Sequence, residues 1–277
     1  MGSEKKHRYF IQSLAKGLAG LQAFTDIGRP LILSELAQAV GITNTAALRL
    51  CYTLTELGFI RRDSRRQYRL TPNVLRLGYP TICCSDWNDI AKYYIEQLFK
   101  EVRETVGLSI LEGTYIMYVI RITEREYMPL DIRIGTRLPV YCTAMGKVMM
   151  ALGSPEKTRS ILHKLAFRPL THRTITHVDK FLEELDKVRM KGYAINDEEL
   201  SIGNRAVAAP VVDKHGYAVA SINIAMPTTE YTRSQMEENL APQVIRTARE
   251  ISEALIKMEA PLVMEGVSRR KMEKSKN

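Results

Sequence analysis

Guanidinium groups bind phosphate, and one short segment of this chain is dense in them. Five arginines occur within nine residues: Arg61, Arg62, Arg65, Arg66 and Arg69. Only Asp63 opposes their charge, whereas an unspecialised surface hairpin normally mixes both signs. The weaker interpretation is that these side chains only keep a hairpin in solution. The segment therefore predicts contact with a polyanion such as duplex DNA.

The distribution of charge along the chain supports a binding surface at its front. Residues 1–80 carry 12 Lys and Arg against 5 Asp and Glu, whereas residues 81–265 carry 23 basic and 25 acidic side chains. The last twelve residues hold five basic side chains and one acidic one. We expect the polyanion at the first third of the chain and interpret residues 266–277 as a basic, disordered tail.

Catalytic and metal-binding chemistry find little support. Asp197, Glu198 and Glu199 are consecutive, so their carboxylates point in different directions, and no nucleophile stands at a catalytic spacing. The chain has no glycine-rich phosphate loop. Its four cysteines and five histidines lack metal-ligand spacings. We therefore expect that the protein is not an enzyme and that it binds no metal and no cofactor.

The composition is that of a protein that stays in water. No stretch approaches the roughly 20 apolar residues that cross a bilayer, and the first residues lack the apolar core of a signal peptide. We expect a cytoplasmic protein with no membrane partner.

Short helices followed by a hairpin would position the arginines. Apolar side chains at three- and four-residue steps predict a helix over 11–24, a second over 33–40 with Ser34 as its N-cap, and a third that Thr43 caps. The predicted buried stripe of the third helix comprises Ala47, Cys51, Leu54 and Leu57. Two strands follow, over 59–62 and 67–70. This order predicts a winged helix-turn-helix over residues 1–80.

The second helix of such a motif enters the major groove of DNA, and the wing lies against the phosphates. The residues predicted to contact DNA are Thr43, Asn44, Thr45, Ala46, Leu48 and Arg49 of the helix and Arg61, Arg62, Arg65 and Arg66 of the wing.

A linker helix is predicted over residues 81–106. Ile90, Tyr94, Leu98 and Val102 form an apolar seam that either packs on its own chain or on a partner's. A homodimer, possible also as a dimer of dimers, is favoured because one recognition helix reads too few base pairs for useful specificity.

Residues 107–265 alternate strands and helices. Strands are expected over 108–112, 115–122, 132–134, 194–196, 206–213 and 217–225, and helices over 143–152, 155–165, 178–191 and 234–258. The two final strands turn back at 214–216, which indicates a sheet covered by helices. The fold class expected for the whole chain is therefore α+β.

Several motifs resemble those of the isocitrate lyase regulator (IclR) family of transcriptional regulators. In the front third they are residues 13–18, 41–43, 53–60 and 68–72; in the rest they are 132–139, 142–147, 192–199 and 206–211. Ala46, Ala47 and residues 70–78 resemble the branch that controls aromatic-acid and β-ketoadipate catabolism. The resemblance implies a GAF-like effector domain over 107–265, behind a DNA-binding domain.

An anion site is expected where Thr143 starts a helix, because free amides of Ala144, Met145 and Gly146 would point at one spot. The alternative is that Thr143 is only a helix cap. The resemblance implies a pocket walled by Ala144, Met145, Asn196, Ala206, Asn223 and Ala225, and Arg133 and Tyr141 could add a guanidinium and a ring edge for an aromatic acid. The predicted function is a DNA-binding regulator controlled by a small carboxylate. The alternative is an architectural DNA-binding protein without a ligand.

Overall fold

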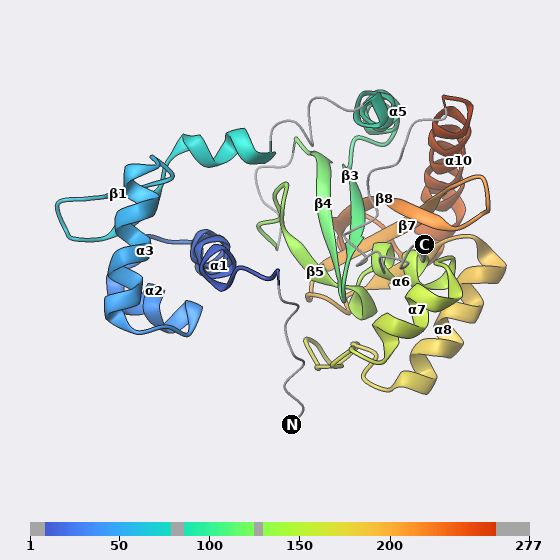
Figure 1. The fold of residues 1–277 in the computed structure, drawn as a ribbon. Coiled ribbons are helices and arrows are strands. Elements are labelled where there is room, and N and C mark those ends of the chain that lie inside the picture. The colour runs from blue at the N-terminus through green and yellow to red at the C-terminus, as the bar shows by residue number, and fades with distance from the viewer. Residues whose placement is uncertain (1–8, 79–85, 125–129, 259–277) are drawn as a thin grey trace, which may run out of the picture. The chain divides into compact units, whose positions relative to one another are not determined.

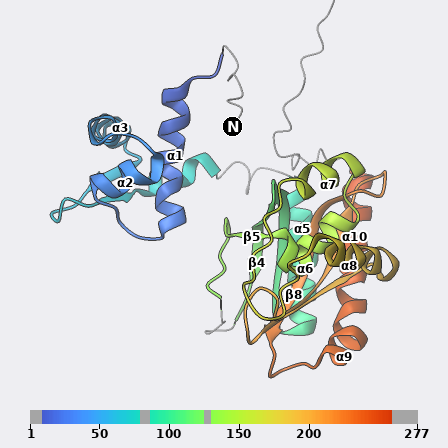
Figure 2. The ribbon, with the colours of Figure 1, turned by 90° about the horizontal axis from the view of Figure 1, so that it is seen from below.

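The structure, a computed structural model, describes residues 9–78, 86–124 and 130–258. It divides between residues 84 and 85 into two units, each of which is described by itself (Figures 1 and 2). The predicted tail over 266–277 lies outside the described residues.

The described part of the first unit contains helices and a hairpin. The helices are α1 (Gln12–Ile27), α2 (Leu33–Val40) and α3 (Asn44–Glu56), and the strands are β1 (Ile60–Arg62) and β2 (Tyr68–Leu70), followed by a short 3-10 turn, η1 (Pro72–Val74). The strands pair antiparallel. Leu31, Leu36, Cys51 and Ile60 are buried at the centre of this unit. The predicted winged helix-turn-helix is confirmed.

The ends of the helices correct two details of the prediction. Thr43 caps α3 as expected, because its hydroxyl accepts a hydrogen bond from the amide of Ala46 at 3.3 Å. Ser34 does not cap α2; the carboxylate of Glu35 instead reaches back to the amide of Ile32 at 3.0 Å, and the helix begins at Leu33. Leu57 was predicted to be buried but is 58% exposed, because α3 ends at Glu56 and Leu57 lies beyond the buried stripe.

The second unit is built on one antiparallel sheet of six strands in the order β5-β4-β3-β8-β7-β6. The strands are β3 (Thr105–Glu112), β4 (Tyr115–Ile122), β5 (Arg137–Pro139), β6 (Ala194–Asp197), β7 (Asn204–Val212) and β8 (Ala218–Pro227). The strand predicted over 132–134 is wrong. Arg133 and Thr136 form a turn there, in which each backbone amide donates a 2.9 Å hydrogen bond to the other residue, so the strand starts at Arg137.

Helices cover both faces of this sheet. They are α5 (Asp86–Val102), α6 (Ala144–Ala151) after the 3-10 turn η2 (Val140–Cys142), α7 (Pro155–Leu162), α8 (Val178–Lys191), α9 (Arg233–Gln235), the π-helical turn η3 (Met236–Leu240) and α10 (Ala241–Lys257). The helix predicted over 234–258 is therefore interrupted by the π turn. No described helix is long and apolar enough to cross a membrane.

The segment predicted as a linker helix is part of the core of the second unit. Helix α5 packs against α10 and β3, and its predicted seam contributes to the core beneath them. Leu98 and Val102 are buried, and Ile90 and Tyr94 are partly buried against the same cluster. Of the two alternatives for this seam, the structure therefore shows packing within one chain.

The two faces of the sheet differ in side-chain size. Residues paired directly across strands point to the same face. Val106, Leu108, Ile222 and Ile224 fill the face beneath α5 and α10. The opposite face, beneath α6 and α8, carries Gly107, Asn223 and a set of alanines, Ala206, Ala208 and Ala225. These small residues leave space between the sheet and α6.

Candidate functional site

One face of α3 is exposed and polar, as expected of a helix that reads DNA. Asn44, Thr45, Arg49 and Thr53 are exposed, on the sides of the helix away from the buried stripe of Ala47, Cys51 and Leu54. Leu48 is also exposed, at 52% of its surface. Thr43 is exposed while it caps the helix, and Ala46 is half-buried. The six helix residues predicted to contact DNA thus lie together on the first turns of α3.

Asp63 holds the tip of the β1–β2 hairpin. Its carboxylate accepts hydrogen bonds from the amides of Arg65 and Gln67, each at 2.9 Å, and from Nε of Arg69 at 3.1 Å. These hydrogen bonds lower the pKa of Asp63, and the bond from the Gln67 amide has the largest effect. Arg66 adopts a left-handed conformation with φ 61° at the turn. The carboxylate of Asp63 is therefore bonded to groups within the hairpin.

The four wing arginines predicted to contact DNA, Arg61, Arg62, Arg65 and Arg66, are exposed. Arg62 lies over the ring of Tyr68, at 5.5 Å from its centroid. Arg65 and Arg66 form no ion pair with another described residue. The hairpin tip therefore presents two guanidinium groups with no carboxylate partner in this part of the chain.

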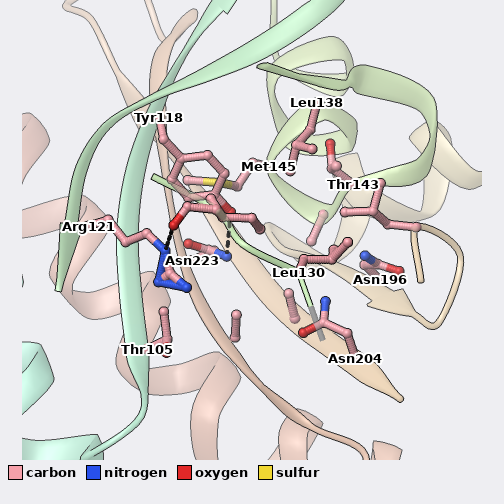
Figure 3. Close-up of a pocket in the computed structure, with 15 residues that line it drawn as sticks. Thr105, Tyr118, Arg121, Leu130, Leu138, Thr143, Met145, Asn196, Asn204 and Asn223 are labelled. Atoms are coloured by element: carbon pink, nitrogen blue, oxygen red, sulfur yellow. Dashed lines mark hydrogen bonds between the residues drawn. The ribbon is translucent and has the colours of Figure 1, made fainter. Parts of the chain in front are cut away.

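The second unit contains a cavity between the sheet and α6 (Figure 3). Its lining combines apolar side chains with amides, hydroxyls and one guanidinium: Thr105, Tyr118, Arg121, Leu130, Ile132, Leu138, Thr143, Ala144, Met145, Asn196, Leu200, Asn204, Ala206, Asn223 and Ala225. None of these described lining residues is acidic. The cavity has a free volume of about 20 Å³. Apolar walls with a few convergent polar groups are the usual lining of a ligand site.

The register of the strands explains how these side chains meet. Gly107 pairs with Arg121 on β4 and with Asn223 on β8, so the three share one row. A bulge at Val119 brings Tyr118, three residues before Arg121, to the same face. A Cβ atom on Gly107 would lie 2.7 Å from the Tyr118 ring, so only glycine fits between these side chains. In the next row Asn196, Ala206, Ala225 and Thr105 pair in sequence.

Two polar atoms in this cavity are buried without a hydrogen-bond partner: Nη1 of Arg121 and Oδ1 of Asn223. The rest of each side chain is held in place. Nε of Arg121 donates to the carbonyl of Ile132 at 2.8 Å, and Nδ2 of Asn223 donates to the hydroxyl of Tyr118 at 3.3 Å. Burial raises the pKa of Tyr118 to about 12, so its hydroxyl keeps its proton at neutral pH. Burial also lowers the pKa of Arg121.

The start of α6 corrects the predicted set of free amides. The hydroxyl of Thr143 accepts from the amide of Gly146 at 3.1 Å and donates to the carbonyl of Pro139 at 3.0 Å. Gly146 is therefore used by the cap, whereas the amides of Ala144 and Met145 have no partner among the described residues. A Cβ atom on Gly146 would lie 2.2 Å from the Val140 carbonyl oxygen, which shows how tightly this turn packs.

Seven of the nine residues predicted for the effector site line the cavity: Thr143, Ala144, Met145, Asn196, Ala206, Asn223 and Ala225. Arg133 and Tyr141 do not. Arg133 is exposed and pairs with Asp131 at 3.0 Å. Tyr141 is buried, and its hydroxyl donates to the carbonyl of Arg168 at 3.0 Å.

Sequence reasoning missed the guanidinium of the cavity, Arg121, and its neighbour Tyr118. The available signal was a lone arginine within the otherwise apolar strand over 115–122. Alternation alone would place Tyr118 and Arg121 on opposite faces. The bulge at Val119 places the two side chains on the same face instead. The residue types in this strand do not predict a bulge.

A buried ion pair lies behind the cavity. Lys147 on α6 is 1% exposed; its Nζ lies 2.5 Å from Glu199 and donates to the carbonyl of Ile195 at 3.1 Å. The amide of Glu199 donates to Oδ1 of Asn196 at 2.9 Å. Burial raises the pKa of Glu199, against the opposing effect of Lys147. The pair thus ties α6 to the loop that orients Asn196, a residue of the cavity wall.

Comparison with protein families covers both units. The model described as the IclR helix-turn-helix domain matches residues 13–64, and the model described as the C-terminal domain of bacterial transcriptional regulator IclR matches residues 84–253. The chain belongs to the IclR family. Like its relatives it is a transcriptional regulator with a DNA-binding and an effector domain, and not an enzyme.

Relatives within the IclR family include regulators of aromatic-acid metabolism. The Pca regulon regulatory protein of Pseudomonas putida is 30% identical over 89% of this chain and 84% of its own. The p-hydroxybenzoate hydroxylase transcriptional activator of Acinetobacter baylyi is 30% identical over 87% of this chain and 91% of its own. A transcriptional regulator of Rhodococcus, 36% identical, superposes with a TM-score of 0.77 over 90% of this chain and all of that one. These matches agree with the predicted branch of the family.

Proposed function

We propose that this IclR-family regulator binds operator DNA through α3 and the β1–β2 hairpin, and that a small carboxylate in the cavity of the second unit changes the affinity of that binding. The observation that carries the ligand half is Arg121. Its Nη1 is buried without a partner, in a cavity whose described lining holds no acidic side chain. A carboxylate is the natural counter-charge for such a guanidinium.

The DNA half rests on exposure and charge. Asn44, Thr45 and Arg49 can reach base edges, because they lie on the free face of the recognition helix. Arg65 and Arg66 suit phosphates, since no described carboxylate neutralises them. Because operator DNA is chromosomal, the protein is proposed to act in the cytoplasm.

The ligand is proposed to be an aromatic acid or one of its catabolites. Leu130, Ile132, Leu138 and Met145 give the cavity apolar walls, and the Tyr118 ring adds an aromatic one. Because the free volume is about 20 Å³, these side chains must move apart to admit a ring. Two relatives are named for the Pca regulon and for p-hydroxybenzoate hydroxylase, which places related regulators with aromatic substrates. The effector site in this proposal comprises the seven predicted lining residues together with Tyr118 and Arg121.

The regulator is proposed to act as a homodimer, or as a dimer of dimers. Leu14 and Leu18 on α1 and Ile11 at its N-cap follow a helical spacing, and all three are exposed within one chain. A second copy that covers this stripe would remove apolar surface from water and bring two recognition helices to one operator.

The test begins with duplexes selected from a random library by the full chain. Thermal unfolding of the full chain is then measured with benzoate, 4-hydroxybenzoate and succinate. An acid at 100 times its dissociation constant should add about 2.7 kcal/mol of stability. Arg121→Gln should abolish this gain, whereas Arg133→Gln, which removes a guanidinium outside the cavity, should retain it. Selected duplexes with no stabilisation by any acid would favour the ligand-independent architectural protein.

A further inference from the structure

The unpartnered polar atoms of the cavity specify more than a negative charge. Arg121 offers a donor at Nη1, and Asn223 offers an acceptor at Oδ1; both atoms are buried. A buried polar atom without a partner is costly, so a ligand that fits this end of the cavity supplies both partners. The lining therefore demands one group that accepts and another that donates.

These two atoms lie at the same end of the cavity. Arg121 and Asn223 flank Gly107 on adjacent strands, and the Cβ position of Gly107 is 3.1 Å from Oδ1 of Asn223. Figure 3 shows Tyr118, Arg121 and Asn223 pointing toward one another. The donor and the acceptor thus belong to one row of the sheet, and the ring of Tyr118 lies over Gly107 between them.

The amide of Asn223 turns its nitrogen toward the hydroxyl of Tyr118. Because Nδ2 donates to this hydroxyl at 3.3 Å, Oδ1 is the amide atom left for a ligand. The hydroxyl accepts that bond and keeps its own proton, so it is a second donor for a carboxylate beside Arg121.

A plain carboxylate satisfies only part of this arrangement. Its oxygens accept from Arg121 and Tyr118, but they offer Asn223 Oδ1 no hydrogen and set an acceptor against an acceptor. A hydroxyl next to the carboxylate would donate to Oδ1. An ammonium group could donate as well, but it would lie beside the positive Arg121 in a cavity with no acidic lining among the described residues.

We propose that the effector is a hydroxy acid, with its carboxylate on Arg121 and Tyr118 and a hydroxyl on the neighbouring carbon donating to Oδ1 of Asn223. This inference rests on the proposed function and narrows its ligand class. It assigns Asn223 as the residue that determines specificity for the hydroxyl. Removal of the hydroxyl from a bound acid should weaken binding by about tenfold to a hundredfold.

The experiment uses matched acids on the full chain, with dissociation constants from isothermal titration calorimetry. The pairs are mandelate with phenylacetate, lactate with propionate, and malate with succinate; phenylglycine replaces the mandelate hydroxyl by an amine. The hydroxylated member of a bound pair should bind at least about tenfold tighter, and mandelate should exceed phenylglycine. In Asn223→Ala the ratio of the two dissociation constants within a pair should fall to about one.

Ser221→Ala provides the matched control. Ser221 lies two residues away on the same strand, is buried, bonds to Ser109 at 3.0 Å and does not line the cavity. Its loss should leave the preference intact.

The outcomes separate the two proposals. If the plain acids bind as tightly as the hydroxy acids, or if the preference survives in Asn223→Ala, the hydroxy-acid inference is wrong while the carboxylate regulator stands. If none of the seven acids binds, the proposed function fails, and this inference fails with it.

Discussion

The two arginines at the tip of the β1–β2 hairpin give the clearest quantitative prediction for DNA binding. Arg65 and Arg66 are exposed and form no ion pair among the described residues, so each is free to contact a phosphate. The change is Arg65→Ala together with Arg66→Asn. Asparagine is chosen at position 66 because it tolerates the left-handed backbone, φ 61°, that Arg66 adopts.

The expected effect is on the salt dependence of binding. Each phosphate contact contributes about 0.9 to the slope of log affinity against log salt, so loss of two contacts lowers the slope by about 1.8. Between about 50 and 200 mM salt, the advantage of the wild-type chain over the variant should then shrink about twelvefold.

Fluorescence anisotropy with a selected duplex and with an unrelated one, across a salt series, measures both slopes. The loss should be the same for the two duplexes, because phosphate contacts carry no sequence information. Arg69→Ala is the control: Arg69 pairs with Asp63 at 3.1 Å, and its removal should leave the slope unchanged. An unchanged slope in the double variant would refute the assignment of the hairpin as a phosphate-binding wing.

Three further predictions concern the recognition helix, the cavity wall and the buried ion pair. Arg49→Ala should reduce discrimination at individual base pairs by about 1–3 kcal/mol in competition with singly substituted duplexes; a uniform loss would show that Arg49 only contacts the backbone. Gly146→Ala should lower the free energy of unfolding in urea by about 1–3 kcal/mol, because the added Cβ would lie 2.2 Å from the Val140 carbonyl oxygen. Gly17→Ala is the control: a Cβ at this position contacts nothing, so the variant should not destabilise α1. Burial raises the pKa of Glu199 above its ordinary 4.5, so the native state binds this proton more tightly than the unfolded chain does. As the pH rises from 4.5 through the raised pKa, the wild-type chain should therefore lose free energy of unfolding relative to Glu199→Gln. A difference in free energy of unfolding between the two chains that stays constant with pH would contradict a raised pKa.

The local structure of this chain was largely predictable where one signal dominates. Thr43 caps α3, and the helix predicted over 178–191 matches α8 (Val178–Lys191), because a polar N-terminus and a buried stripe at 181, 185 and 188 leave no competing structure. Where two residues can serve one role, the sequence does not decide between them. Glu35 satisfies the amide of Ile32 and displaces Ser34 as the predicted cap.

The candidate site was predictable only in part, for a reason of register. The alanines and asparagines of the wall were implied by the resemblance to the IclR family, and among their strands the antiparallel pairing of β7 with β8 was predicted. The guanidinium of the cavity was not predicted correctly. Arg133, the arginine that was named, lies in a turn and bonds to Thr136, whereas the arginine in the cavity is Arg121 on β4, the strand that contains the bulge. The partners that satisfy a buried group are tertiary contacts, and no spacing in the sequence encodes them.

The most direct test of coupling between the two units is the affinity of the full chain for a selected duplex, measured with and without a bound acid. Occupancy of the cavity is established in parallel by calorimetry. We predict that saturation with a binding acid changes the dissociation constant for DNA by about 5- to 150-fold, and that Arg121→Gln removes the change without altering DNA binding in the absence of acid. A dissociation constant that stays the same while the cavity is demonstrably filled would contradict this prediction.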